Sequence, residues 1–492
     1  MRRTTLVALL AVGAIVVGGG GFVIGSQLMP PGGGEPRRTA SPTASPSPSE
    51  RATVPPLAKA WADRPSVDLR YDIARDHESA KGVATASFTP DKRVCDALIF
   101  RSWPNKPEIA DHGGSMTVHR ATVDGRKVTP AYERKGAPAA TQGTLLRLPL
   151  RDCVAAGSTV EARISFTVEM ARRSGERVGT NGTGEMWLAS AYPVLAWERG
   201  HGWMTQPAVD VFGEMDGTEE FRLELDVVAP RGDTVLGMGR PLGTSNGPRE
   251  GTTRHRFAAD PVRNVAVGIG GYRVTTREIA GVRTRVGVSD DGSLATANDW
   301  LDKIELELGR LEGRFGRFPY RDLWVTVIPD TTGIEFPGAI FYGDYSAQEV
   351  RGGDLVAHEL AHMWFYGLVG NDQGRDPWLD ESFATYAQAL ADDQAFLYRQ
   401  PMDVPSFAAN RVGEPMTYWE RNPDTYGAGV YRQGAQMLFE ARQRAGEQRW
   451  DAAMRAYLAD NAHRIVRPED FVDAVDHLPG AVETLRRYGA VE

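Results

Sequence analysis

Cysteine is scarce in this 492-residue chain, which contains only Cys95 and Cys153. Neither residue stands in a C-x-x-C pair, so the sequence offers no cysteine metal site. An even number of cysteines in an exported chain favours one disulfide between them. Two buried free thiols are the alternative, and the cellular compartment decides between the two.

Lysine is scarce as well, with seven among the 56 basic residues, and the net charge is −8. The arginines form no stripe of positive charge along the sequence. Because nucleic-acid-binding domains usually carry such a stripe, we expect no nucleic-acid partner. No repeat of fixed period is visible. The hydrophobic fraction of 41% is typical of a globular protein, and the length alone suggests about three domains.

Long hydrophobic runs are absent apart from one at the N-terminus. Twenty uncharged residues, Leu6 to Gly25, follow Arg2 and Arg3. This is the length that a transmembrane helix needs, and the arginines orient it with the body outside the cytoplasm. We therefore expect a signal-anchor or transmembrane helix at residues 1–29, making this a single-pass protein of the cell membrane. A cleaved signal peptide and a secreted body are the alternative, although no A-x-A site follows.

The composition and hydrophobic spacing of the remaining chain divide it into a linker and two larger parts. Residues 30–60 are rich in Pro, Ser and Thr and cannot build a core. Residues 61–285 contain short alternating runs broken by turn residues, which predict an N-terminal antiparallel β-sandwich. Residues 286–492 change to helical spacing, beginning with a long helix in "ANDWLDKIELELGRLEGRF". The sequence thus predicts a multidomain α+β protein.

The segment "DLVAHELAHMWFYG" carries the first chemical signal. On a helix that begins after Asp354 and ends near Gly367, His358 and His362 lie on one face, one turn apart. Two imidazoles placed in this way can bind one Zn²⁺, and Glu359 beside them can act as a general base. HExxH alone also occurs on ordinary solvated helix faces, so the motif needs further support.

A catalytic zinc needs a third protein ligand, and Glu381 is the candidate. It follows His362 by nineteen residues in "DPWLDESFATYAQAL". We expect a second helix here, capped by Asp376 and with Pro377 in its first position. Packed against the first helix, it would direct Glu381 toward the same metal.

This spacing resembles the gluzincin peptidases of the aminopeptidase N family, whose pattern is HExxH, eighteen residues, then Glu. "WLDESFATY" is similar to the family block W-L-N-E-G-F-A. "GIEFPG" stands where the family has its G-x-M-E-N substrate segment, with Glu335 twenty-three residues before His358. "YRQG" is similar to the family's Y-x-K-G, with Tyr431 as its tyrosine.

The resemblance implies a thermolysin-like α/β zinc peptidase domain at residues 286–492 with a helical C-terminal half. One Zn²⁺ per chain would be bound by His358, His362 and Glu381, with Glu359 as the general base. Tyr431 would stabilise the oxyanion, and Tyr426 is the alternative phenol. Glu335, with Gly333 beside it, would bind the free amine of a peptide substrate. We expect a monomer.

Three departures from the family pattern affect these expectations. Ile334 and Phe336 replace the family's methionine and asparagine in "GIEFPG". Gln388 stands seven residues after Glu381, where the family often has a glutamate behind a zinc histidine; an amide can still accept the imidazole N–H. About sixty residues follow Tyr431, which leaves no room for a large C-terminal helical domain. A more open cleft is expected in consequence.

The sequence therefore supports an extracytoplasmic zinc metallopeptidase, with an aminopeptidase as the leading hypothesis. The altered "GIEFPG" segment keeps an endopeptidase of narrow specificity open. A catalytically weak or inactive binding protein that retained the fold is the alternative from another class. The complete set of candidate ligands and the base favour the enzyme.

Overall fold

The structure is a computed structural model that describes residues 53–172, 177–182, 184–211, 217–329 and 331–492. The predicted anchor at residues 1–29 and most of the predicted linker lie outside the described residues. Among the described residues, no helix is long and apolar enough to cross a membrane.

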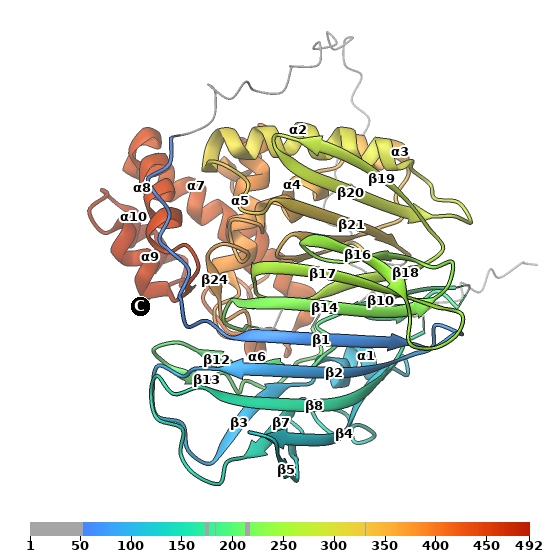
Figure 1. The fold of residues 1–492 in the computed structure, drawn as a ribbon. Coiled ribbons are helices and arrows are strands. Elements are labelled where there is room, and N and C mark those ends of the chain that lie inside the picture. The colour runs from blue at the N-terminus through green and yellow to red at the C-terminus, as the bar shows by residue number, and fades with distance from the viewer. Residues whose placement is uncertain (1–52, 173–176, 183, 212–216, 330) are drawn as a thin grey trace, which may run out of the picture. The chain divides into compact units, whose positions relative to one another are not determined.

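The N-terminal half is built on an eight-stranded sheet (Figure 1). Exposed and buried side chains alternate along most of its strands, as expected for a sheet with one face on a core. All neighbouring strands are antiparallel, as predicted, except β1 and β14, which are parallel. The order is β16 (Arg240–Asn246), β17 (Thr252–Val262), β14 (Phe221–Pro230), β1 (Ser66–Ile73), β2 (Ser79–Phe88), β8 (Val160–Glu169), β4 (Ser115–Val123) and β5 (Arg126–Val128).

Two four-stranded sheets share the core with this large sheet. The central strands β10 (Glu185–Ala189) and β3 (Ala97–Arg101) are wholly buried. The disulfide predicted between Cys95 and Cys153 is present, beside the ends of β3 and β7 (Leu145–Pro149). One sheet runs β15 (Thr234–Leu236), β18 (Ala266–Gly270), β10 (Glu185–Ala189), β9 (Val178–Thr180). The other runs β11 (Val194–Leu195), β3 (Ala97–Arg101), β7 (Leu145–Pro149), β6 (Ala131–Glu133). A small hairpin joins β12 (Trp197–Glu198) to β13 (Gly202–Trp203).

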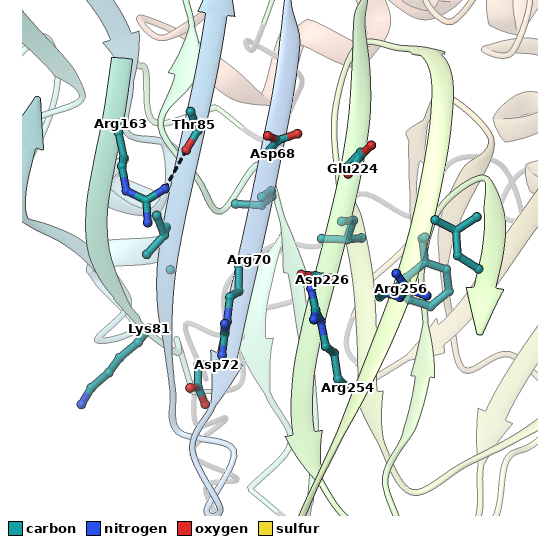
Figure 2. A pocket seen from close by; sticks show the side chains of 16 residues that line it. Asp68, Arg70, Asp72, Lys81, Thr85, Arg163, Glu224, Asp226, Arg254 and Arg256 are labelled. Atoms are coloured by element: carbon teal, nitrogen blue, oxygen red, sulfur yellow. Dashed lines mark hydrogen bonds and ion pairs between the residues drawn. The ribbon is translucent and has the colours of Figure 1, made fainter. Parts of the chain in front are cut away.

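The outer face of the large sheet is hollowed by a depression of about 550 Å³. Figure 2 shows that charged side chains of both signs cover it, with Asp68 and Glu224 on adjacent strands. Arg254 forms an ion pair with Asp226. Because positive and negative groups alternate here, the surface has the character of a solvated sheet face, and it contains none of the predicted site residues.

A five-stranded mixed sheet begins the second half of the fold. Its order is β19 (Tyr272–Ile279), β20 (Val282–Ser289), β21 (Asp322–Ile328), β23 (Ala339–Gly343) and β22 (Gly333–Phe336), so β22 is an edge strand. The predicted domain boundary between residues 285 and 286 falls inside β20, and the division into domains stays a prediction. The predicted long helix is α2 (Ala297–Phe315), which Thr296 and Asp299 begin with a capping box.

Helices supply most of the remaining residues, which confirms the α+β fold class. Helix α5 (Trp378–Ala391) is buried at every position, so its side chains either form the core or line a site. The other helices are α1 (Pro107–Ala110), α3 (Ala347–Gly352), α4 (Leu355–Ala361), α6 (Met416–Trp419), α7 (Gln433–Ala445), α8 (Glu447–Asp460), α9 (Pro468–Val475) and α10 (Ala481–Arg487). Short 3₁₀ turns η1 (Trp103–Asn105), η2 (Leu397–Arg399) and η3 (Pro423–Thr425), the π-helix η4 (Gly427–Arg432) and the paired strands β24 (Gly370–Asn371) and β25 (Ile465–Val466) complete the fold.

Candidate metal centre

Helix α4 carries the HExxH motif but is shorter than predicted. It ends at Ala361, and His362 is its C-cap, so the predicted end near Gly367 is wrong. The chain leaves the helix there through tight turns, with Tyr366 in a left-handed conformation (φ 105°). The two imidazoles nevertheless converge, because the Nε2 atoms of His358 and His362 lie 3.1 Å apart.

Helix α5 brings Glu381 to the same point from its first turn. Oε2 of Glu381 lies 3.3 Å from Nε2 of His358 and 3.5 Å from Nε2 of His362. The predicted start of this helix is wrong by one position: Pro377 is the N-cap and Trp378 the first residue. Asp376 makes no cap because its carboxylate accepts a hydrogen bond from Arg375 at 2.8 Å.

The three ligand atoms fit a zinc ion. Ligands of a tetrahedral zinc at about 2.0–2.1 Å lie about 3.3 Å from one another, close to the three separations observed. Oε2 of Glu381 is buried and accepts no hydrogen bond from the described residues, although both imidazoles face it. Two neutral nitrogens and one carboxylate are the donor set that zinc prefers in catalytic sites. A zinc ion is therefore expected here.

Hydrogen bonds at the far side of each imidazole hold it in this orientation. Nδ1 of His358 lies 3.1 Å from Oε1 of Gln388, so the amide expected behind this histidine takes that place. Nδ1 of His362 lies 2.6 Å from Oδ1 of Asp380, and Gln373 donates to the other oxygen of Asp380. Sequence reasoning missed Asp380. The signal that could have identified it is a carboxylate in the apolar run "WLDESFATY", because a buried acid needs a partner.

"GIEFPG" forms an edge strand and a hairpin turn. Residues of β22 pair with β23, and Gly338 takes the left-handed conformation (φ 78°) that the turn requires. Glu335 is 3% exposed, and its Oε1 has no hydrogen-bond partner among the described residues. Its carboxylate lies within 4.8 Å of the candidate ligand atoms of Glu359 and His362. The strand thus brings Glu335 to the metal centre.

Gly333 begins the same strand and touches the predicted base. A Cβ atom at this position would lie 2.3 Å from Oε1 of Glu359, closer than any side chain can approach. A side chain at this position would therefore displace the Glu359 carboxylate, independently of any contact with substrate.

The carboxylates of the site strongly affect one another's protonation. Burial raises the pKa of Glu359 well above its usual value, and the charges of Glu335 and Glu381 raise it further. Burial also raises the pKa of Glu335 to about 8, against the opposing effect of His362. Burial would raise the pKa of Glu381 too, but His362 and His358 outweigh it and lower the value. A divalent cation would offset this repulsion and favour the ionised forms.

Tyr431 lies on the π-helix η4 and borders the site from a third side. Its ring stacks on His358 with centroids 5.8 Å apart and planes 13° apart. Tyr426 meets Tyr431 nearly at right angles, 5.4 Å between centroids. Burial and the Glu381 carboxylate raise the pKa of Tyr431 well above its usual value, so its hydroxyl keeps its proton and can donate a hydrogen bond.

Helix α5 and η4 are held together beside the ligands. Oγ of Ser382 donates to the carbonyl of Val430 at 2.7 Å. A Cβ at Gly434 would lie 1.9 Å from the same Oγ, which explains the glycine of "YRQG". Ser382, which follows the candidate ligand Glu381, therefore anchors the π-helix that carries Tyr431 through this hydrogen bond.

Residues 344–486 match the family described as Peptidase family M1 domain. Over this range the chain is similar to M1 peptidases. The matched range includes the three candidate ligands, Glu359 and Tyr431, while Glu335 precedes it. The resemblance to the aminopeptidase N family is thereby confirmed.

Known relatives extend the comparison to the rest of the fold. Aminopeptidase N of Streptomyces lividans is 30% identical over 151 residues, which are 27% of this chain but 17% of that protein, so the chain matches far less than two thirds of its length. An M1 zinc metallopeptidase of Deinococcus radiodurans has a TM-score of 0.63 at 18% identity, covering 88% of this chain and 95% of that one. A mutant of it, bound to a Tyr-Ser-Ala substrate, has the same TM-score at 17% identity, covering 87% and 95%. These structures share the fold of this chain.

Proposed function

We propose that this chain is an extracytoplasmic zinc metallopeptidase that removes N-terminal residues from peptides. The observation that carries the proposal is the convergence of three ligand atoms, 3.1–3.5 Å apart, beside the carboxylates of Glu359 and Glu335. His358, His362 and Glu381 would hold the ion. Zinc bound there would act as a Lewis acid that polarises the substrate carbonyl and lowers the pKa of water.

The residues around the ligands divide the remaining tasks. Glu359 would take a proton from the attacking water and pass it to the leaving amine. Its carboxylate is buried and lies beside the edge strand at Gly333. Tyr431 would donate its hydroxyl hydrogen to the oxygen that becomes negative as the carbonyl is attacked.

Glu335 would bind the α-amine of the substrate and so fix which bond is cut. With the amine at Glu335 and the scissile bond at Glu359, which touches Gly333, the peptide would run along β22 in the direction opposite to that strand. β22 is an edge strand among the described residues, so its free backbone groups could pair with such a peptide. This direction places the residues after the cut beyond Gly333.

The packing of Ile334 and Phe336, the two residues of "GIEFPG" that differ from the family pattern, favours amino-terminal cleavage over internal cleavage. Ile334 and Phe336 are 1% and 0% exposed, and Phe336 contacts Phe341 with ring centroids 5.3 Å apart. Side chains alternate along a strand, so both residues point away from the face that carries Glu335. Their replacement therefore alters the core and leaves the amine-binding carboxylate in position.

An extracytoplasmic location is supported by two independent features. The disulfide between Cys95 and Cys153 is of a kind that persists in oxidising compartments. The uncharged stretch from Leu6 to Gly25, outside the described residues, has the length of a membrane anchor. We propose the cell membrane as the location, with the body outside the cytoplasm.

Cleavage of matched free and N-acetylated peptides by the full-length protein, with and without a zinc chelator, tests the proposal. We expect rapid removal of the first residue from free peptides, loss of activity with chelator, and at least about a hundredfold slower cleavage of acetylated peptides, since charge-assisted hydrogen bonds to Glu335 are lost. Equal cleavage of both would reject aminopeptidase action. Stoichiometric zinc without any cleavage would favour the inactive binding protein instead.

A further inference from the structure

The two imidazoles of the metal centre differ in the group that holds their second nitrogen. His362 has the carboxylate of Asp380 at 2.6 Å, whereas His358 has the amide oxygen of Gln388 at 3.1 Å. Both contacts leave Nε2 facing Glu381. One candidate ligand is therefore backed by a charge and the other by a neutral dipole.

Each carboxylate oxygen of Asp380 has a hydrogen-bond partner. Its second oxygen accepts a hydrogen bond from Nε2 of Gln373 at 2.7 Å, and both residues are 1% exposed. A carboxylate in a wholly buried helix is costly unless it is hydrogen-bonded, so contacts at both oxygens account for its presence there. These two contacts place the Asp380 carboxylate, which in turn orients the ring of His362.

Gln388 is engaged on both sides of its amide as well. Its oxygen faces His358, and its side chain is hydrogen-bonded to Asp354. Asp354 occupies the N-cap position of α4 but forms no side-chain cap, so its carboxylate is available for this contact. A glutamate at position 388 would set a second carboxylate against Asp354.

We propose that Asp380 is a positioning residue of the metal centre, whose carboxylate fixes His362 and makes this imidazole a stronger zinc ligand than His358, which faces an amide. A carboxylate behind an imidazole fixes its tautomer and raises its basicity more than an amide does. This inference rests on the zinc site of the proposed function.

Zinc affinity of the full-length chain, measured by competition with a chromogenic chelator and no substrate, tests this role of Asp380. The first variant is Asp380→Asn, which keeps the shape of the side chain and removes its charge. The second adds Gln388→Glu with Asp354→Asn, so that the new carboxylate meets an amide at position 354. Asp460→Asn, an exposed acid at the end of α8, is the matched control.

We expect Asp380→Asn to weaken zinc binding about 10- to 100-fold. The triple variant should recover at least about tenfold of that loss, because the carboxylate is restored behind His358. A purely structural role would give no such recovery. Unchanged affinity in Asp380→Asn, or no recovery in the triple variant, would overturn the inference while wild-type zinc binding still upholds the metal site. Absence of zinc binding by the wild type would instead reject the proposed function.

Discussion

Oε1 of Glu359 fills the space beside Gly333 in which any side chain at that position would stand. The distance from this oxygen to a Cβ built on Gly333 is 2.3 Å. Helix α4 and the edge strand β22 therefore meet at a carboxylate and a glycine. The proposed base thus lies against the proposed substrate-binding strand, and a side chain added at Gly333 must move the base.

Gly333→Ala should lower kcat while zinc content stays at the wild-type level. The added methyl group must displace the Glu359 carboxylate, and a shift of about 1 Å in a catalytic group can cost about a hundredfold in rate. Steady-state kinetics and metal analysis of the purified variant measure both quantities. Gly313→Ala on α2 is the control, because a Cβ there meets no atom within 4 Å. A wild-type kcat in Gly333→Ala would show that Glu359 need not hold its position.

Glu359→Gln should retain zinc and lose nearly all turnover. The amide keeps the size of the side chain but cannot accept a proton, and removal of a general base costs about 10²- to 10⁴-fold. Glu278→Gln, an exposed acid on β19, should leave the rate unchanged. Metal analysis together with single-turnover cleavage separates loss of the base from loss of zinc. Wild-type peptidase rates in Glu359→Gln would rule out the mechanism.

Tyr431→Phe should reduce kcat by about 10²- to 10³-fold with little change in KM, the usual effect of losing an oxyanion donor. Tyr426→Phe is the comparison, because Tyr426 contacts Tyr431 and has no ring contact with either zinc-site histidine in the described structure. Kinetics of both variants on one free peptide measure the difference. A larger loss in Tyr426→Phe would assign the donor to that residue.

The zinc-site candidates could be predicted because their signal is local or lies at a fixed spacing. His358, Glu359 and His362 share one turn of α4, and the position of Glu381 follows from the motif spacing. The last residue of α4 could not be predicted, since tight turns after it determine where it ends. The first residue of α5 could not be predicted either, since the Arg375–Asp376 ion pair takes the expected cap.

Contacts between distant segments explain the remaining differences. The parallel pairing of β1 with β14 joins strands about 150 residues apart, and no local pattern encodes it. "GIEFPG" becomes a strand through pairing with β23, and Asp380 gains its role through a histidine eighteen residues earlier. Such partners can be recognised only when the fold brings them together.

Glu219 is a buried acid whose protonation makes the stability of the fold depend on pH. Glu219 is 5% exposed, and its Oε1 accepts a hydrogen bond from the backbone N–H of Arg199 at 2.7 Å. Burial raises the pKa of Glu219 to about 7, although the Arg199 N–H and the charges of Arg263 and Arg199 oppose this rise. The neighbouring Glu220, which pairs with His463 at 3.0 Å, raises it further.

Glu219→Gln should make the fold less sensitive to alkaline pH. Because the pKa of Glu219 is higher in the folded state than the ordinary glutamate value of 4.5, its contribution to stability is fully present below about pH 4.5 and is lost as the pH rises toward 7. The difference corresponds to about 3 kcal/mol at 1.36 kcal/mol per unit. Glutamine stays neutral and still accepts the Arg199 N–H, so the variant should gain stability over the wild type between pH 5 and pH 8. Thermal unfolding at both values measures this gain, with Glu278→Gln in parallel. A wild-type pH dependence in Glu219→Gln would mean that Glu219 is already ionised in the folded protein at pH 5.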